Sequence, residues 1–214
     1  MTLVRSILAL ALALAGAATA QAADGTHVYA FTALLDGKPI GEHRFTVVTE
    51  GATRRVTSDA TFAVKFLGFE AFHYRHHAEE QWAGDCLSGL QSTTDDDGKP
   101  ASVKLVKSGD ANEITTAAGS QSVGGCLMTY AYWNPALRTQ ARLLNPQTGK
   151  VDAVKVERVF TARIPVGGKD VVADDWRITG GESAIDVWLT PQGEWVGLDS
   201  VVAHGKHKLT YRLP

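Results

Sequence analysis

The sequence lacks most of the short motifs by which enzymes are recognised. It contains no G-x-S-x-G nucleophile elbow, no H-E-x-x-H zinc helix, no P-loop and no dinucleotide-binding glycine fingerprint. A catalytic site whose groups converge from distant strands is the alternative, because the order of residues along a chain does not show which side chains meet in the fold. We therefore assign no catalytic residue and no cofactor, and we favour a non-enzymatic role without deciding the question.

An excess of charge of one sign is also missing. The formal net charge is -2 at pH 7, and the lysines and arginines are scattered. A nucleic-acid partner would need a basic stripe, and a basic partner would need an acidic tail. Neither is present. Beyond the N-terminal segment there is no second long apolar run, so no integral membrane span is expected.

The N-terminal residues 1–20 have the layout of a secretory signal peptide. Arg5 supplies a positive start, and an apolar run over residues 7–17 follows. This run is shorter than the roughly 20 residues of a transmembrane helix, and it leads into a small-residue cleavage pattern at Ala18-Thr19-Ala20. Cleavage after Ala22 or Ala23 and an uncleaved anchor are alternatives.

Export predicts a periplasmic location for the remaining chain. Residues 21–214 suit one domain rather than two, and they can bury a substantial core. No cysteine follows the apolar run closely, so lipid attachment is not expected.

Cysteine is scarce, and the two cysteines are Cys86 and Cys126. An even number in an exported chain favours one disulfide, with two buried thiols as the alternative. In the chain-entropy model, closing this loop of roughly 40 residues contributes about 4 kcal/mol. A metal site at these cysteines is not expected, because neither has a His or Cys partner at ligand spacing.

Apolar and polar side chains alternate along several segments, which is typical of half-buried antiparallel strands. This pattern is found in residues 54–66, 154–164 and 201–213. Glycine-containing turns separate the segments, among them Asp36-Gly37 and Asp97-Gly98. The pattern predicts an all-β fold: a single antiparallel barrel or strongly curved half-barrel of about ten strands.

One short helix is expected in this fold. It would run from Pro135 to Arg142, with Asn134 as its N-cap. The Ser- and Gly-rich residues 117–125 are expected to form a loop. Whether the interior of the barrel is hollow or filled by side chains is open at this stage.

Three histidines, His73, His76 and His77, lie within the segment FEAFHYRHHAEEQW. In a strand, His76 points to one face, while His73, Arg75 and His77 point to the other. His73 and His77 would then lie about 13 Å apart, too far to share a metal ion. We therefore predict no metal site, and we interpret His73, Arg75 and His77 as a polar strand face.

Aromatic side chains are the remaining candidates for a ligand site. Their ordinary role is core packing, and the alternative is that several line an apolar cavity. The densest group lies beside the expected helix. The candidate ligand-binding residues are Trp82, Tyr130, Tyr132, Trp133, Asn134 and Trp188.

Several segments together resemble an exported bacterial family, the domain of unknown function six-one-three-four. They are YAFTALLDGKPIGEHRF, VKFLGFEAFHYRHHAEEQWAGDCLSGLQSTTDDDGK, the YWNP motif, LLNPQTGK and WLTPQGEWVGL. The matching positions include Trp82, Tyr132, Trp133 and Asn134. The resemblance implies a periplasmic all-β protein without assigned catalytic residues.

Three hypotheses follow for the function. The first is an exported β-barrel that binds an apolar or amphipathic, lipid-like ligand. The second is an envelope enzyme with a convergent site of His73, His77 and carboxylates. The third is a structural envelope protein that binds a protein partner through an exposed apolar patch.

Overall fold

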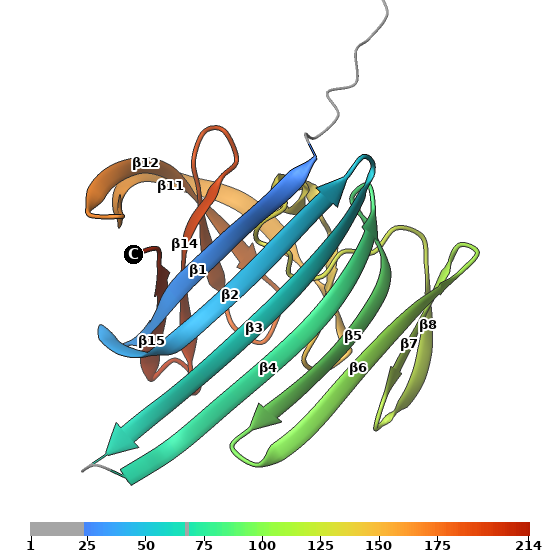
Figure 1. Cartoon of the computed structure of the whole chain (residues 1–214), viewed down its shortest axis with the longest axis horizontal. Helices are drawn as coiled ribbons and strands as arrows, with labels where there is room; N and C mark the ends of the chain where they lie inside the picture. The colour runs from blue at the N-terminus through green and yellow to red at the C-terminus, as the bar shows by residue number, and fades with distance from the viewer. Residues whose placement is uncertain (1–23, 67–68) are drawn as a thin grey trace, which may run out of the picture.

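The computed structural model describes residues 24–66 and 69–214, which fold into antiparallel β-structure (Figure 1). The expected signal peptide, residues 1–20, lies outside the described residues. The strands are β1 (Gly25–Leu35), β2 (Lys38–Glu50), β3 (Thr53–Phe66), β4 (Phe69–Ala83), β5 (Cys86–Asp96), β6 (Lys99–Ser108), β7 (Ala111–Thr116), β8 (Gly119–Gly124), β9 (Arg142–Leu144), β10 (Val151–Ala153), β11 (Lys155–Val166), β12 (Lys169–Thr179), β13 (Ile185–Leu189), β14 (Trp195–Val202) and β15 (His207–Arg212). A short 3-10 helix, η1 (Pro135–Thr139), lies between β8 and β9.

Thirteen strands form one open sheet in the order β11-β12-β13-β14-β15-β1-β2-β3-β4-β5-β6-β7-β8. Each strand therefore pairs with its neighbour in sequence, except where β15 pairs with β1. Two meanders, β1 to β8 and β11 to β15, are joined in this way at the middle of the sheet. In the described part of the chain no helix has the length and apolar character that crossing a membrane requires.

Asp-Gly pairs form the tight turns between β1 and β2 and between β5 and β6. Asp36 and Gly37 have φ angles of 50° and 79°, and Asp97 and Gly98 have φ angles of 52° and 80°. Hairpin turns of two residues need positive φ at both positions, which glycine adopts freely and aspartate tolerates. These turns are as predicted from the sequence.

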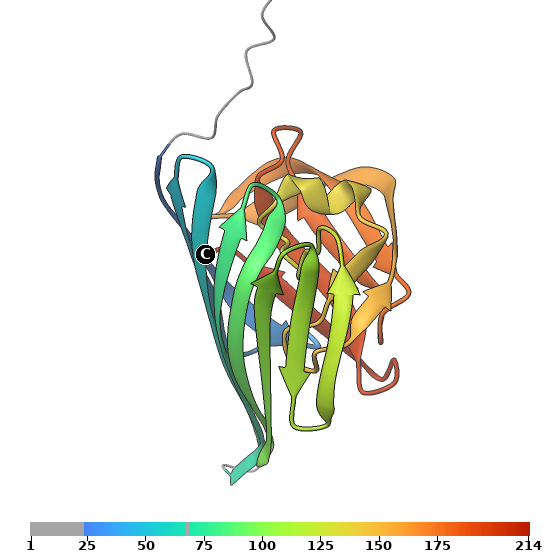
Figure 2. The same cartoon turned by 90° about the vertical axis from the view of Figure 1, so that its right-hand side faces the viewer.

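The alternation predicted for the strands sorts their side chains onto an inner and an outer face. On β4 the side chains of His76, Ala78, Glu80 and Trp82 are buried, whereas Arg75 and the other odd-numbered neighbours are exposed. The sheet curves, and its buried face lies on the concave side, where it covers the main core (Figure 2).

An aromatic cluster around Trp195 forms the centre of this core. The Trp195 side chain is fully buried, and its ring centroid lies 4.3 Å from that of Phe31, 5.1 Å from Phe45 and 5.3 Å from Tyr132. Aromatic pairs at such distances stabilise a core beyond the area that they bury. The cluster joins β1, β2 and β14 to the segment that precedes η1.

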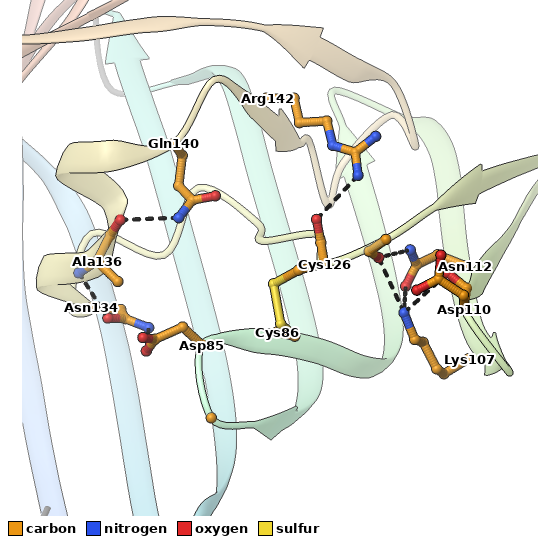
Figure 3. The surroundings of a disulfide bond; sticks show 12 residues. Asp85, Cys86, Lys107, Asp110, Asn112, Cys126, Asn134, Ala136, Gln140 and Arg142 are labelled. Atoms are coloured by element: carbon orange, nitrogen blue, oxygen red, sulfur yellow. Dashed lines mark hydrogen bonds between the residues drawn. A yellow bond between two sulfur atoms is a disulfide. The ribbon is translucent and has the colours of Figure 1, made fainter. Parts of the chain in front are cut away.

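The chain between β8 and β11 lies between the two arms of the curved sheet (Figure 2). It contains η1 and the two-stranded β9-β10 sheet. The disulfide between Cys86 and Cys126 ties the start of this segment to β5, with the Cα atoms 5.1 Å apart (Figure 3). The predicted disulfide is thus confirmed.

Arg142 and Asn112 hold the same region through backbone carbonyls (Figure 3). The Arg142 guanidinium donates to the carbonyls of Gly124 and Cys126, and Asn112 Nδ2 donates to the Gly125 carbonyl at 2.8 Å. The carbonyl groups of Gly124, Gly125 and Cys126 therefore all accept hydrogen bonds from side chains.

The predicted fold class is confirmed in its coarse form, but the predicted strand number and a closed barrel are wrong. The sheet has thirteen strands and is not closed. One reason is that residues 117–125, expected to be a loop, contain β8, whose side chains are mostly exposed. An edge strand with mostly exposed side chains shows little alternation, so its composition resembles that of a loop.

The predicted helix is shorter than expected. Asn134 is its N-cap and Pro135 opens it, as predicted, but the helix ends at Thr139 and Arg142 already belongs to β9. Leu137 is its only buried residue. With one buried anchor, little apolar packing is available to extend the helix by another turn.

Candidate functional site

A cavity of about 370 Å³ lies between the inner face of the sheet and the segment of residues 129–133. Strands β2, β3 and β4 contribute His43, Phe45, Ser58, His76, Ala78 and Glu80 to its wall. Residues 145–147 and 182–183 line it as well, together with the β14–β15 hairpin. The wall therefore combines apolar side chains with a small set of polar groups, as is usual for a small-molecule site.

His43 lies at the centre of a cluster of polar side chains in this wall. Its Nε2 atom lies 2.8 Å from Ser58 Oγ, and its Nδ1 atom lies 3.2 Å from the Tyr211 hydroxyl. Burial, helped by the nearby His76, lowers the pKa of His43 to about 3. The imidazole is therefore neutral at pH 7 and carries one N–H donor and one acceptor.

His76 is the second histidine of the cavity, and its side chain is buried. Its Nδ1 atom lies 2.9 Å from Thr94 Oγ1, and burial together with His77 lowers its pKa to about 4. Asp59 opposes this shift with a smaller effect. His76 is thus also neutral at pH 7, so His43 and His76 bring no positive charge into the cavity.

Glu80 is the buried carboxyl group of the cavity wall. Trp82 Nε1 donates a hydrogen bond of 3.0 Å to Glu80 Oε2, and Thr129 contributes a second hydrogen bond. Burial nevertheless raises the pKa of Glu80 to about 7, because it outweighs the two hydrogen bonds that favour the anion. Near neutral pH this carboxyl is divided between its neutral and ionised forms.

The contact between Ser58 and His43 has the geometry of a nucleophile and its base, but its chemistry is unfavourable for catalysis. An effective general base has a pKa near the working pH. With a pKa of about 3, the His43 imidazole holds a proton too weakly to take one from Ser58 efficiently. The arrangement is better suited to hydrogen bonding than to proton transfer.

The structure brings three of the six candidate ligand-binding residues into the cavity wall: Tyr130, Tyr132 and Trp133. The Tyr130 hydroxyl donates a 2.8 Å hydrogen bond to Asp152 Oδ2, which fixes this ring. Trp82 lies behind the wall, with its ring edge-on to Trp133 at 5.3 Å. It reaches the cavity only through its hydrogen bond to Glu80.

Asn134 and Trp188 do not line the cavity. Asn134 Oδ1 accepts from the Ala136 amide at 3.0 Å, and its Nδ2 donates to Asp85 Oδ1 at 3.1 Å (Figure 3). It therefore caps η1. Trp188 belongs to a separate apolar cluster with Ile164, Ala173 and Val196, on the opposite face of the sheet from its neighbours Val187 and Leu189.

His73, Arg75 and His77 lie on one face of β4, and this is the outer face of the sheet. His77 Nδ1 lies 2.7 Å from Asp59 Oδ1, and His73 Nε2 lies 3.4 Å from Asp95 Oδ2. In residues 24–66 and 69–214, no three His, Cys, Asp or Glu side chains gather where they could hold one metal ion. These histidines contact separate surface carboxylates rather than forming one common site.

Sequence reasoning missed His43, Ser58, Glu80 and Tyr211 as residues of the site. Only Glu80 carried a usable signal: an acidic side chain placed by the alternation on the apolar face of its strand, between Ala78 and Trp82. His43 and Ser58 also lie on strands in which apolar and polar side chains alternate. Small or amphipathic polar residues often occur on the inner face of such strands, so neither residue is a signal of a site. Their convergence depends on the pairing of β2 with β3 and of β1 with β15.

A buried acidic group also lies on the other face of the sheet. The Asp175 side chain is 1% exposed, and neither of its oxygens has a hydrogen-bond partner. Arg177 Nη2 is 3.9 Å away and pairs more closely with Asp186, at 2.6 Å from its Nε atom. Burial and the charge of Asp186 raise the pKa of Asp175 to about 6, against the weaker effect of Arg177.

We expect the substitution Asp175→Asn to stabilise the protein at pH 8 but not at pH 4. The folded state holds the Asp175 proton more tightly than the unfolded chain, so stability falls as pH rises from about 4 through 6. Removing the charge should raise the free energy of unfolding by about 1–3 kcal/mol at pH 8. Urea unfolding at both pH values measures this.

Asp170→Asn is the matched control, because Asp170 lies on the same strand, β12, and is exposed. It should change stability at pH 8 by no more than about 0.5 kcal/mol. An equal effect of Asp175→Asn at both pH values would contradict the assignment of a charge penalty to this residue.

Comparison with known proteins agrees with the all-β, barrel-like architecture. The sequence profile of the family described as "Domain of unknown function (DUF6134)" matches residues 31–213. The chain belongs to this family, as its motifs indicated. A search of curated proteins found no match.

Among solved structures, the chain is similar to a beta-barrel-like protein of the domain of unknown function DUF1849 from Brucella abortus. The TM-score is 0.62 at 10% sequence identity, and the match covers 88% of this chain and 95% of that one. At this identity the similarity shows the fold alone.

Proposed function

We propose that this protein is exported to the periplasm and binds an apolar or amphipathic, lipid-like small molecule in its interior cavity. The observation that carries the proposal is the cavity of about 370 Å³ between the sheet and residues 129–133. Its volume lies within the range of small-molecule sites, roughly 300–1,000 Å³. Phe45, Tyr132 and Trp133 provide apolar surface, while His43 and Glu80 provide polar groups to orient a head group.

Two features support the export part of the proposal. Residues 1–20 have the composition of a cleaved signal peptide. The disulfide between Cys86 and Cys126 is of the kind that persists in oxidising compartments such as the periplasm.

An enzymatic role receives less support from the same residues. The imidazoles inside the cavity have low pKa values, and the pairs of His73 and His77 with carboxylates lie on the outer face, away from the cavity. The alternative of partner binding has one supporting observation, since Val159 and Phe160 on the edge strand β11 are about half exposed.

We expect the neutral dye Nile red to bind the purified mature protein with increased fluorescence, and the substitution Ala78→Leu to weaken this binding. Ala78 lines the cavity and is 1% exposed, so a larger side chain there takes up ligand space. A clash of this size costs about 1–2 kcal/mol, which is about tenfold in affinity. Fluorescence titration measures the dissociation constant.

Ala101→Leu is the matched control, because Ala101 is exposed on β6 and does not line the cavity. It should leave the affinity unchanged. The same affinity in both variants, or no binding by the wild-type protein, would count against an interior ligand site.

A further inference from the structure

We infer that the cavity prefers an amphiphile with a protonated amine head group over one with a carboxylate head group. This inference rests on the proposed function, since it names the ligand class of the same site. It comes from the charges of the cavity wall, the burial of Glu80 and the distribution of hydrogen-bond donors around it.

The formal charges of the cavity wall are all negative. Glu80 and Glu182 line the cavity, and no Lys or Arg is among its described lining residues. Glu182 is exposed at the rim, whereas Glu80 is buried inside. A carboxylate head group that entered this space would lose its hydration and meet no cation in return.

Glu80 is held in a geometry that suits an anion but lacks a cation. Trp82 Nε1 and the Thr129 side chain hydrogen-bond to it. Their effect does not balance the cost of burial, and no described side chain adds a positive charge that lowers its pKa. An ammonium group of a ligand would supply this missing charge through a short, charge-assisted hydrogen bond.

The other titratable groups that face the cavity do not change this balance. His43 from β2 and His76 from β4 are neutral at pH 7, because burial lowers both pKa values. Burial raises the pKa values of Tyr130, Tyr132 and Tyr211, so their hydroxyl groups stay protonated. His204 lies on the exposed turn between β14 and β15 at the rim.

Arg54 is a cation close to this wall, but its charge is already paired with a carboxylate. The Arg54 guanidinium lies over the Trp133 ring, 5.1 Å from its centroid, but it pairs with Asp85 at 2.8 Å. Arg54 does not line the cavity. It therefore cannot neutralise a head group bound beside Glu80.

Binding of an amine should be coupled to the ionisation of Glu80. Only the ionised carboxylate attracts the ammonium strongly. Because the pKa of Glu80 is about 7, Glu80 carries a proton at lower pH, and an amine ligand must displace this proton. An alkylamine stays protonated up to a pH of about 10. We therefore expect amine affinity to rise by roughly 30-fold from pH 5.5 to pH 8.5.

The test compares dodecylamine, dodecanol and dodecanoic acid as competitors of Nile red, each below its micelle concentration. At pH 8.5 we expect dodecylamine to bind best and at least about tenfold more tightly than dodecanoic acid. Glu80→Gln should remove this preference and the pH dependence. Glu182→Gln, the control at the rim, should keep the pH dependence.

A measurement on the wild-type protein covers the case in which Glu80→Gln does not fold. Calorimetric titration of dodecylamine at pH 7, in buffers of different ionisation enthalpy, should show release of about half a proton per ligand. Dodecanol should release none. Proton release by both ligands, or by neither, would overturn the inference.

The outcomes separate the two proposals. If neither Nile red nor any of the three chains binds, the proposed function fails. If dodecanoic acid binds as tightly as dodecylamine and Glu80→Gln has no effect, lipid-like binding stands and the amine preference is wrong.

Discussion

Replacing Cys86 and Cys126 with serine is expected to lower the free energy of unfolding by about 4 kcal/mol. The disulfide closes a loop with a sequence separation of 40, which limits the conformations of the unfolded chain. In the folded state the bond also fixes the start of the cavity wall. Directly next to it, the Leu87 amide donates to the Leu127 carbonyl at 2.8 Å.

Urea unfolding of the oxidised protein and of the double serine variant measures the loss. Wild-type protein unfolded in the presence of reductant should show the same loss, and the variant should not respond to reductant. Nile red affinity should fall as well, because residues 129–133 become less fixed. A loss below about 1 kcal/mol would show that the hydrogen bonds of Asn112 and Arg142 hold this segment without the disulfide.

Trp195→Ala is expected to cost about 3–5 kcal/mol, the range for removing a large buried aromatic side chain. Trp195 is fully buried, and its ring contacts Phe31, Phe45 and Tyr132. Its Nε1 atom also donates a 2.8 Å hydrogen bond to the Gly197 carbonyl. Chemical denaturation followed by circular dichroism measures the change.

Trp195→Phe should cost less than the alanine variant, because it keeps most of the ring contacts. Val106→Ala is the surface control, since Val106 is 48% exposed, and it should change stability by no more than about 0.5 kcal/mol. If Trp195→Ala cost no more than this control, the aromatic cluster would not be the centre of the core.

The parts of the fold that the sequence predicted depend on local chemistry. The Asp36-Gly37 and Asp97-Gly98 turns could be identified because positive φ restricts the residue types, and β3 and β4 because their faces differ in polarity. The edge strand β8 could not be found, because its side chains are mostly polar and exposed and show no clear alternation. The absence of closure depends on pairing across the whole sheet, which no local pattern records.

The residues of the candidate site were likewise predicted only in part. Tyr130, Tyr132 and Trp133 were identified because aromatic residues gather there in sequence. Trp188 was assigned to the same site, but it lies on the opposite face of β13. Val187, Trp188 and Leu189 are all buried and apolar, so only Asp186, two residues before Trp188, distinguishes the two faces of this short strand.

The pairing of β1 with β15 has a consequence for the order of events during synthesis. Strand β1 finds one of its two neighbours only in β15, where Thr32 opposes Arg212 and Leu35 opposes Leu209. Chain elongation therefore produces two separate hairpin arrays, each with an unpaired border, until the final strand joins them. Such distant pairing makes folding slow, because a long loop must close first. A product that ends before β15 would therefore lack the joint between the two arms of the sheet.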